Sequence, residues 1–149
     1  MTAADRHVFG ELDAHLMREG THPRLHDKLG AHPTPGGTRF AVWAPNALAV
    51  SVIGDFNRWA PGAHPLRELA GTGGVWSGEI PGVGRGALYK YHVRSRLRGV
   101  EVAKADPFAI RHELPPSTAS IVWTTEHAWR DAAWMAGRAA RSRPDAPIA

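Results

Sequence analysis

Cysteine is absent from the 149-residue sequence. Its absence excludes a disulfide framework, a thiolate zinc site and a cysteine nucleophile, and it is compatible with a reducing cytoplasm. Long apolar runs are absent too: none approaches the ~20 residues that a membrane-spanning helix needs. The first thirty residues also lack a basic segment followed by an apolar one. These absences predict a soluble cytoplasmic protein without a membrane partner.

The sequence has little that resembles catalytic or ligand-holding machinery. His22 and His26 have the i, i+4 spacing of a helical metal site, but Pro23 disfavours a helix there and no third ligand has a fitting spacing. The glycine-rich residues 82–86 do not follow the strand–loop–helix pattern of a phosphate-binding loop, so they are predicted to form a flexible loop. We therefore expect no metal, no cofactor and no catalytic residue in this chain.

Acidic residues are fewer than basic ones, which gives a net charge of +4. Fifteen of the eighteen basic residues are arginines, and the densest set is Arg94, Arg96 and Arg98, which would line one face of a strand. No nucleic-acid-binding motif accompanies this set. We interpret it as a solvated strand face rather than a phosphate-binding ridge, and expect no nucleic-acid partner.

Glycine and proline are plentiful, with 16 and 12 residues, and between positions 30 and 117 they recur every few residues. Such frequent turn-forming residues favour short strands over long helices. A hydrophobic content of 43% and a charged content of 21% are typical of a globular domain, and 149 residues suffice for a single hydrophobic core.

Seven short runs bounded by turn signals are predicted to be strands: residues 38–44, 48–54, 65–69, 75–80, 87–94, 100–105 and 119–123. Strands of this length and spacing indicate an all-β fold, an antiparallel β-sandwich. Alternation places Leu48 on the same face as Val50 and Val52, and it places Tyr89 and Tyr91 together on the core face of their strand. Three tryptophans inside strand patterns are expected to be core or domain-contact residues: Trp43, Trp76 and Trp123.

Helical patterns are confined to the two ends of the chain. Apolar residues recur at helical spacing within residues 5–20, and Gly20 is a plausible helix stop. Residues 128–141 are rich in alanine and arginine and indicate a helix or helical connector. Residues 141–149 contain two prolines and resemble an interdomain linker.

The most informative segment is residues 54–59 (GDFNRW), which leaves a strand and places Trp59 just beyond a turn. Lys90 lies on the strand face opposite the tyrosines. An exposed indole beside a lysine suits a sugar, because a pyranose has an apolar face to stack and hydroxyls to hydrogen-bond. Trp59 is either such a platform or an indole folded over the sheet edge, and Lys90 is either a sugar ligand or an ordinary solvated lysine. Asp55 and Asn57 are expected to shape the turn.

Eight motifs resemble the N-terminal part of bacterial α-1,4-glucan branching enzymes. In order, they are residues 29–33 (LGAHP), 40–47 (FAVWAPNA), 52–59 (VIGDFNRW), 64–66 (HPL), 80–82 (IPG), 86–91 (GALYKY), 104–108 (KADPF) and 118–120 (TAS). The GDFNxW motif alone would indicate only the wider family 48 of carbohydrate-binding modules. The combination, spread from about residue 20 to 125, favours branching enzymes.

This resemblance implies an immunoglobulin-like sandwich at residues 29–125, preceded by a helical extension (1–28) and followed by a helical connector and linker (126–149) that leads toward a family 13 catalytic barrel. Such a barrel needs about 250 residues, and its chemistry needs two carboxyl groups about 5 Å apart. The fourteen acidic residues here are scattered and lie in no catalytic motif of that family. The parent enzyme would cut an α-1,4 chain and rejoin it through an α-1,6 bond with residues outside this chain.

The same resemblance implies that Trp59 and Lys90 bind glucan. Binding members often carry a second tryptophan after the following hairpin, but residues 98–101 (RGVE) contain no aromatic side chain. We therefore expect weak binding to α-1,4-glucan or glycogen. The alternatives are a docking domain that braces the barrel without sugar affinity and a free-standing glycogen-targeting adaptor. Trp129 and Trp134 are expected to pack near the catalytic domain.

Overall fold

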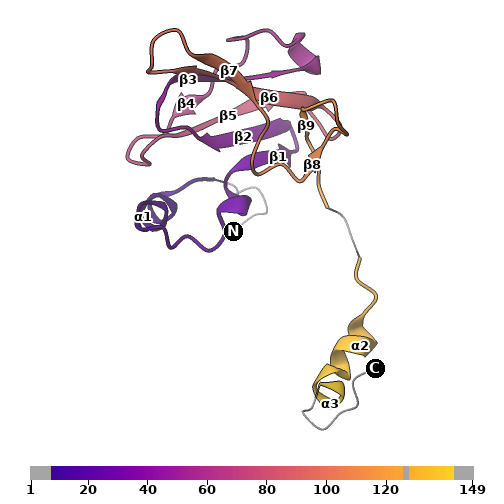
Figure 1. Ribbon diagram of the computed structural model, residues 1–149. Coiled ribbons are helices and arrows are strands. Elements are labelled where there is room, and N and C mark those ends of the chain that lie inside the picture. Colours follow the sequence, from indigo (N-terminus) through magenta and orange to yellow (C-terminus); the bar gives the residue numbers. More distant parts are fainter. Residues whose placement is uncertain (1–7, 126–127, 143–149) are drawn as a thin grey trace.

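The computed structural model describes residues 8–125 and 128–142. Within these residues, short strands form two antiparallel sheets that pack face to face (Figure 1). The prediction of an all-β, immunoglobulin-like sandwich is thereby confirmed. No helix in the described part of the chain is long and apolar enough to cross a membrane.

The first sheet has the strand order β1-β2-β5-β4. Its members are β1 (Gly30–Thr34), β2 (Gly37–Trp43), β5 (Val75–Pro81) and β4 (Arg67–Glu68). The second sheet has the order β3-β6-β9-β8, and β7 also pairs with β6. Its members are β3 (Ala47–Gly54), β6 (Leu88–Ser95), β9 (Ser120–Ile121), β8 (Arg111–His112) and β7 (Glu101–Lys104).

Two strands were not among those predicted, and both lie at sheet edges. β1 carries Pro33, whose missing N–H is tolerated only where a strand has a neighbour on one side. β8 has only two residues and lies between the predicted strands at residues 100–105 and 119–123. Short or proline-containing edge strands give little periodic signal, which explains why they were missed.

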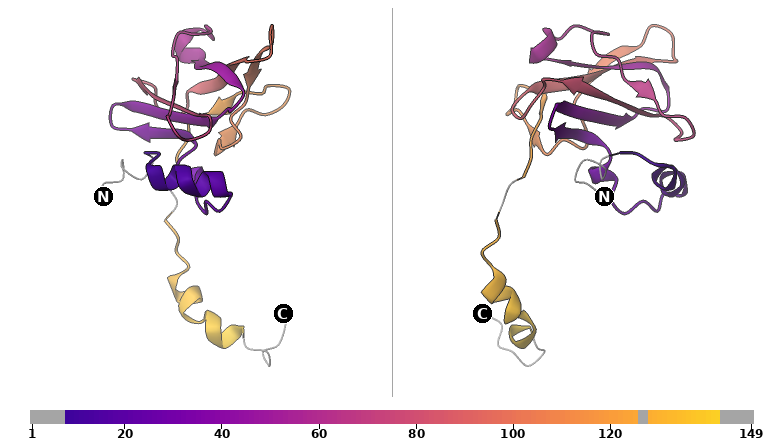
Figure 2. Two further views of the ribbon diagram at one scale, coloured as in Figure 1. Left: turned by 90° about the vertical axis from the view of Figure 1, so that its left-hand side faces the viewer. Right: turned by 180° about the vertical axis from the view of Figure 1, so that it is seen from behind.

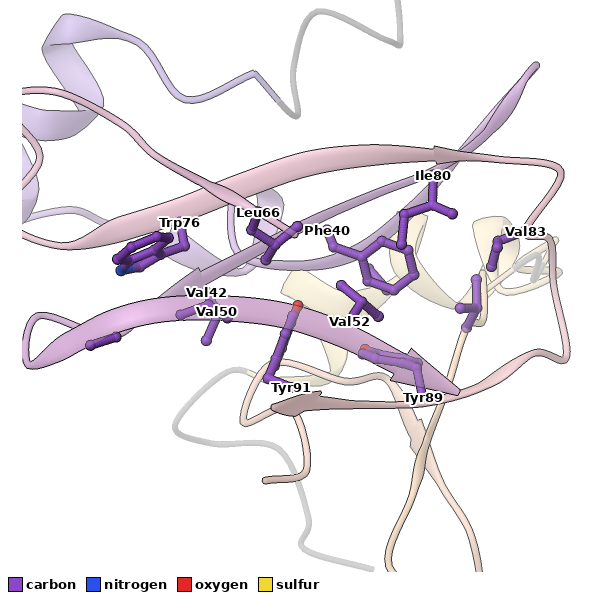
Figure 3. Close-up of a cluster of buried hydrophobic side chains, with 13 residues drawn as sticks. Phe40, Val42, Val50, Val52, Leu66, Trp76, Ile80, Val83, Tyr89 and Tyr91 are labelled. Atoms are coloured by element: carbon purple, nitrogen blue, oxygen red, sulfur yellow. The ribbon is translucent and has the colours of Figure 1, made fainter. Parts of the chain in front are cut away.

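The main core lies between the sheets and follows the predicted alternation (Figure 3). Tyr89 and Tyr91 are fully buried, and Phe40 packs edge-on against Tyr89 with 5.1 Å between ring centroids. Trp76 is buried in the same cluster. Trp43 is not a core residue: it points to the outer face of the first sheet, is 54% exposed, and donates its indole N–H to the Gly73 carbonyl at 3.0 Å.

Leu48 contradicts the alternation prediction. The pairing of β3 with β6 shifts register between Ala47 and Ala49, so Leu48 falls in a bulge. The extra residue turns Leu48 outward, 57% exposed, while Ala47 takes the buried place beside Val50. The prediction that Arg94, Arg96 and Arg98 line one strand face is also wrong, because β6 ends at Ser95 and Arg96 Nε donates to the Ala47 carbonyl.

A second apolar cluster covers the outer face of the first sheet. Leu29, Ala41 and Val75 form its buried part, and side chains from the N-terminal segment pack against them, including Phe9 and Met17. Figures 1 and 2 show helix α1 (Glu11–Glu19) beside this sheet. The helix ends as predicted at Gly20, which has a left-handed φ of 70°. Its predicted start was earlier: residues 5–7 lie outside the described residues, and residues 8–10 are not helical.

Asp13 ties this segment together. Its carboxylate accepts hydrogen bonds from the Gly10 N–H at 2.8 Å and from the His22 ring at 3.0 Å, and it lies 3.1 Å from Lys28 Nζ. Burial acts to raise the pKa of Asp13, but these hydrogen bonds and the lysine charge together hold it below its usual value. The segment after Gly20 therefore closes back onto α1, and it contains the short 3₁₀ turn η2 (Leu25–Asp27).

The C-terminal helices lie apart from the sandwich (Figures 1 and 2). The single predicted helical stretch is two short helices, α2 (Ala132–Ala136) and α3 (Arg138–Arg141). Residues 143–149 of the predicted linker lie outside the described residues. Where the chain leaves the sandwich, Trp123 is half-buried between two guanidinium groups, with Arg85 Cζ 3.9 Å and Arg111 Cζ 4.3 Å from its ring centroid.

Candidate functional site

The candidate site begins where β3 ends at Gly54. A Cβ atom at this position would lie 2.2 Å from the Leu88 carbonyl oxygen of the neighbouring strand, so only glycine fits. The chain then forms the 3₁₀ turn η3 (Asp55–Asn57). Asn57 Oδ1 accepts the Gly54 N–H at 2.9 Å, and Asn57 Nδ2 donates to the Val52 carbonyl at 2.9 Å. The prediction that Asn57 shapes this turn is confirmed.

The two residues after η3 have left-handed backbones. Arg58 has φ 55° and Trp59 has φ 59°, a conformation that costs a residue with a side chain about 1–3 kcal/mol. The Trp59 N–H compensates in part by donating to the Gly54 carbonyl at 2.8 Å. The backbone is therefore held in an unfavourable conformation, which determines the position of the indole.

The structure brings the two predicted site residues together. Lys90 projects from β6 on the outer face of the second sheet, and its Nζ lies 6.0 Å from the centroid of the Trp59 ring. Trp59 is 37% exposed, so the indole is neither buried in the sandwich nor fully extended into solvent. This juxtaposition of an aromatic ring and an amine is the centre of the candidate site.

Thr118 completes this group, and residue-level reasoning from the sequence did not select it. Lys90 Nζ donates a hydrogen bond to Thr118 Oγ1 at 2.7 Å, across 28 positions of sequence. The motif at residues 118–120 carried part of the family resemblance, which was the available signal. The group offers one ring face, one amine and one hydroxyl at an open surface. It can hold a ligand that has both an apolar face and hydroxyl groups.

The remaining candidates have local structural partners. His22 bonds to Asp13, and His26 Nε2 lies 3.6 Å from Asp27. Within residues 8–125 and 128–142, no three histidine, cysteine or acidic side chains gather in a way that could hold a metal ion. Trp129 and Trp134 belong to the C-terminal segment, whose helices lie apart from the sandwich (Figure 1).

An immunoglobulin-like sandwich with an indole and an amine on one outer sheet face has the architecture of an accessory carbohydrate-binding module. The model of the family "carbohydrate-binding module 48 (isoamylase N-terminal domain)" matches residues 28–109. This match spans more than half of the chain, and the chain belongs to that family.

Several curated relatives are branching enzymes, in agreement with the motifs. The chain is 49% identical over 145 residues to 1,4-alpha-glucan branching enzyme GlgB 1 of Streptomyces coelicolor, covering 95% of this chain and 18% of that protein. It is 51% identical to GlgB 1 of Xanthomonas campestris pv. campestris, covering 97% of this chain and 21% of that protein. The chain thus spans about a fifth of the length of these relatives.

Solved structures agree on the fold. Ligand-free PulA from Klebsiella pneumoniae matches with a TM-score of 0.53 and 27% identity, over 65% of this chain and 10% of that one. Klebsiella pneumoniae pullulanase complexed with maltotriose matches with a TM-score of 0.51 and 27% identity, over the same shares. Pullulanase from Bacillus acidopullulyticus, at 23% identity and a TM-score of 0.52 over 65% of this chain and 12% of that one, supports the fold alone.

Proposed function

We propose that this module binds α-1,4-glucan weakly on the surface formed by Trp59, Lys90 and Thr118. The observation that carries the proposal is the position of Lys90 Nζ over the Trp59 ring, with Thr118 as its hydrogen-bond partner. A glucose unit stacked on the indole would present its hydroxyls to this amine and hydroxyl. The left-handed backbone at Trp59 supports the proposal, since unfavourable conformations persist mainly where they serve a function.

Weak binding follows from the small number of contacts. One aromatic platform contributes only about 0.5–1.5 kcal/mol beyond the area it buries. Such a site becomes useful when it is tethered to an enzyme or meets a multivalent polymer such as glycogen, because each further binding event is then intramolecular.

The proposed role is to hold glucan for the catalytic domain of a 1,4-alpha-glucan branching enzyme, which forms α-1,6 branches. The similarity to branching enzymes about five times as long supports this role. In this proposal residues 29–125 are the binding module, residues 1–28 are a helical extension, and residues 126–149 are a helical connector and linker that lead toward a family 13 barrel. The rival proposal is a docking domain that braces the barrel and has no sugar affinity of its own.

Titration of the 149-residue chain with maltoheptaose separates the two proposals. Glucan binding should shift the indole N–H signal of Trp59 in ¹H–¹⁵N spectra, and Trp59→Ala should weaken retention in glycogen-containing native gels while leaving the melting temperature nearly unchanged. Trp43→Ala is the matched control, because Trp43 is a similarly exposed indole on the other sheet. An unshifted Trp59 signal together with equal retention of the Trp59→Ala variant would leave the docking role as the better description.

A further inference from the structure

We infer that an α-glucan chain seated on Trp59 continues into a neighbouring hollow, where Glu101, His92 and Arg94 hydrogen-bond its next glucose units. This inference rests on the proposed function and assigns a second, polar part to the same surface. The hollow measures about 220 Å³ and opens on the outer face of the second sheet.

Small side chains create the hollow. In the β3–β6 pair, Ser51 lies opposite His92 and Ala49 lies opposite Arg94. The side chains on the β3 half of this face are therefore shorter than those on the β6 half. Pro61 and Gly62 line the hollow from the loop that carries Trp59. The Gly62 N–H donates to Ser51 Oγ at 3.0 Å, which fixes this loop against the sheet.

The hollow is continuous with the Trp59–Lys90 surface. Lys90, His92 and Arg94 are alternate residues of β6 and share its outer face, so consecutive side chains are roughly 6.6 Å apart along the strand. The loop that carries Trp59 reaches the hollow within two residues of the indole. A linear oligosaccharide lying along β6 would therefore pass from the aromatic platform to the hollow without leaving the face.

The chemistry of the hollow suits sugar hydroxyls. Glu101 lies opposite Arg94 in the β6–β7 pair, and its Oε2 is 3.5 Å from His92 Nε2. The Glu101 side chain is 55% exposed, so its carboxylate can accept hydrogen bonds from glucan hydroxyls as well as contact His92. Arg94 adds donors beside this acceptor, and hydrogen bonds that involve charged groups are stronger than neutral ones.

Other ligand classes fit less well. An anion such as a phosphate would meet the Glu101 carboxylate at the same position as Arg94. An apolar peptide side chain would have to desolvate three charged or polar groups. A neutral polyhydroxylated chain satisfies both the acceptor and the donors.

The test compares maltose with maltoheptaose on the full chain and on three variants, by calorimetric or NMR titration. Maltose fills the Trp59–Lys90 position, and only the longer glucan reaches the hollow. Glu101→Ala should weaken maltoheptaose binding about tenfold, as expected for losing a charged hydrogen bond, and leave maltose binding unchanged. The His92 ring signals should shift with maltoheptaose and not with maltose.

Glu79→Ala is the matched control, because Glu79 is another half-exposed carboxylate paired with a cation, Arg39, on the outer face of the other sheet. Glu101→Gln gives the same comparison if the alanine variant melts early. If both sugars shift Trp59 while Glu101→Ala binds maltoheptaose normally and His92 is silent, the inference is wrong and the proposed function stands. If neither sugar shifts Trp59, both are wrong.

Discussion

Asn57 is the residue that connects the end of β3 to the turn carrying Trp59. Its side-chain amide binds the Gly54 N–H, the Val52 carbonyl and the His64 ring, each at 2.9 Å. These bonds hold the chain in the shape from which two left-handed residues follow. The position of the indole therefore depends on a residue beneath it that need not touch sugar.

Asn57→Ala should destabilise the fold and weaken glucan binding together. Removing the amide leaves backbone groups of a half-buried turn unpaired, at a cost of about 1–3 kcal/mol in the free energy of unfolding. Urea unfolding measures the first effect and maltoheptaose titration the second. Asn46→Ala, in the exposed turn before β3, is the control and should change neither. Normal glucan binding by Asn57→Ala would show that Trp59 is positioned without it.

Asp106 has a raised pKa, but its role in this fold is structural. Burial raises its pKa, although hydrogen bonds from Tyr89 and Tyr91 oppose the shift. A raised carboxyl pKa often marks a catalytic acid. Asp106, however, is 1% exposed, accepts the Tyr89 hydroxyl at 2.6 Å and the Phe108 N–H at 2.8 Å, and so fastens the 104–108 motif to the core.

At the scale of elements, α1 is attached to the sandwich by one apolar cluster and by a hydrogen bond from Arg18 to the Gly71 carbonyl, whereas the hydrogen bonds of Asp13 tie the segment after α1 back to the helix. The lowered pKa of Asp13 means that the folded state favours its charged form. This contribution to stability is present above the unfolded pKa, near 3.9, and is lost as the pH falls through the lower folded value.

Asp13→Asn should therefore lower stability at pH 7 by about 1 kcal/mol, and the difference from the unchanged chain should shrink as the pH falls below about 4. Thermal melts followed by circular dichroism between pH 3 and 7 test this dependence. Asp131→Asn, an exposed carboxylate in the C-terminal segment, serves as control and should show no such trend. A difference that stays constant with pH would show that the Asp13 charge does not hold the N-terminal segment together.

The strands with a clean period of two could be predicted from the sequence, because burial on one face imposes that period. Tyr89 and Tyr91 inside and Lys90 outside follow from it directly. The bulge at Leu48 could not be predicted from the sequence, because the register of β3 is set by its pairing with β6. The motif at residues 118–120 was a signal for this segment, but the contact of Thr118 with Lys90 could not be predicted, because it depends on the pairing of β6 with β9.

At the scale of the whole molecule, one outer sheet face is covered and the other is open. α1 and its apolar cluster cover the first sheet, whereas β3, β6 and β7 carry the candidate glucan surface on the far side of the sandwich (Figure 1). The C-terminal helices lie on the side of α1, away from β3 and β7 (Figures 1 and 2). The glucan surface is therefore left open by the described parts of both terminal segments.

This arrangement predicts that the chain shortened to residues 1–125 keeps both its stability and its glucan binding. The removed residues include Trp134 and Met135, which are 56% and 47% exposed and lie apart from the core. The melting temperature should stay within about 4 °C, the shift that ~1 kcal/mol produces in a domain of this size, and maltoheptaose should bind equally well. A larger drop would show that the C-terminal segment packs on the sandwich in solution. Tighter maltoheptaose binding by the shortened chain would contradict the prediction that the segment leaves the Trp59–Lys90 surface open.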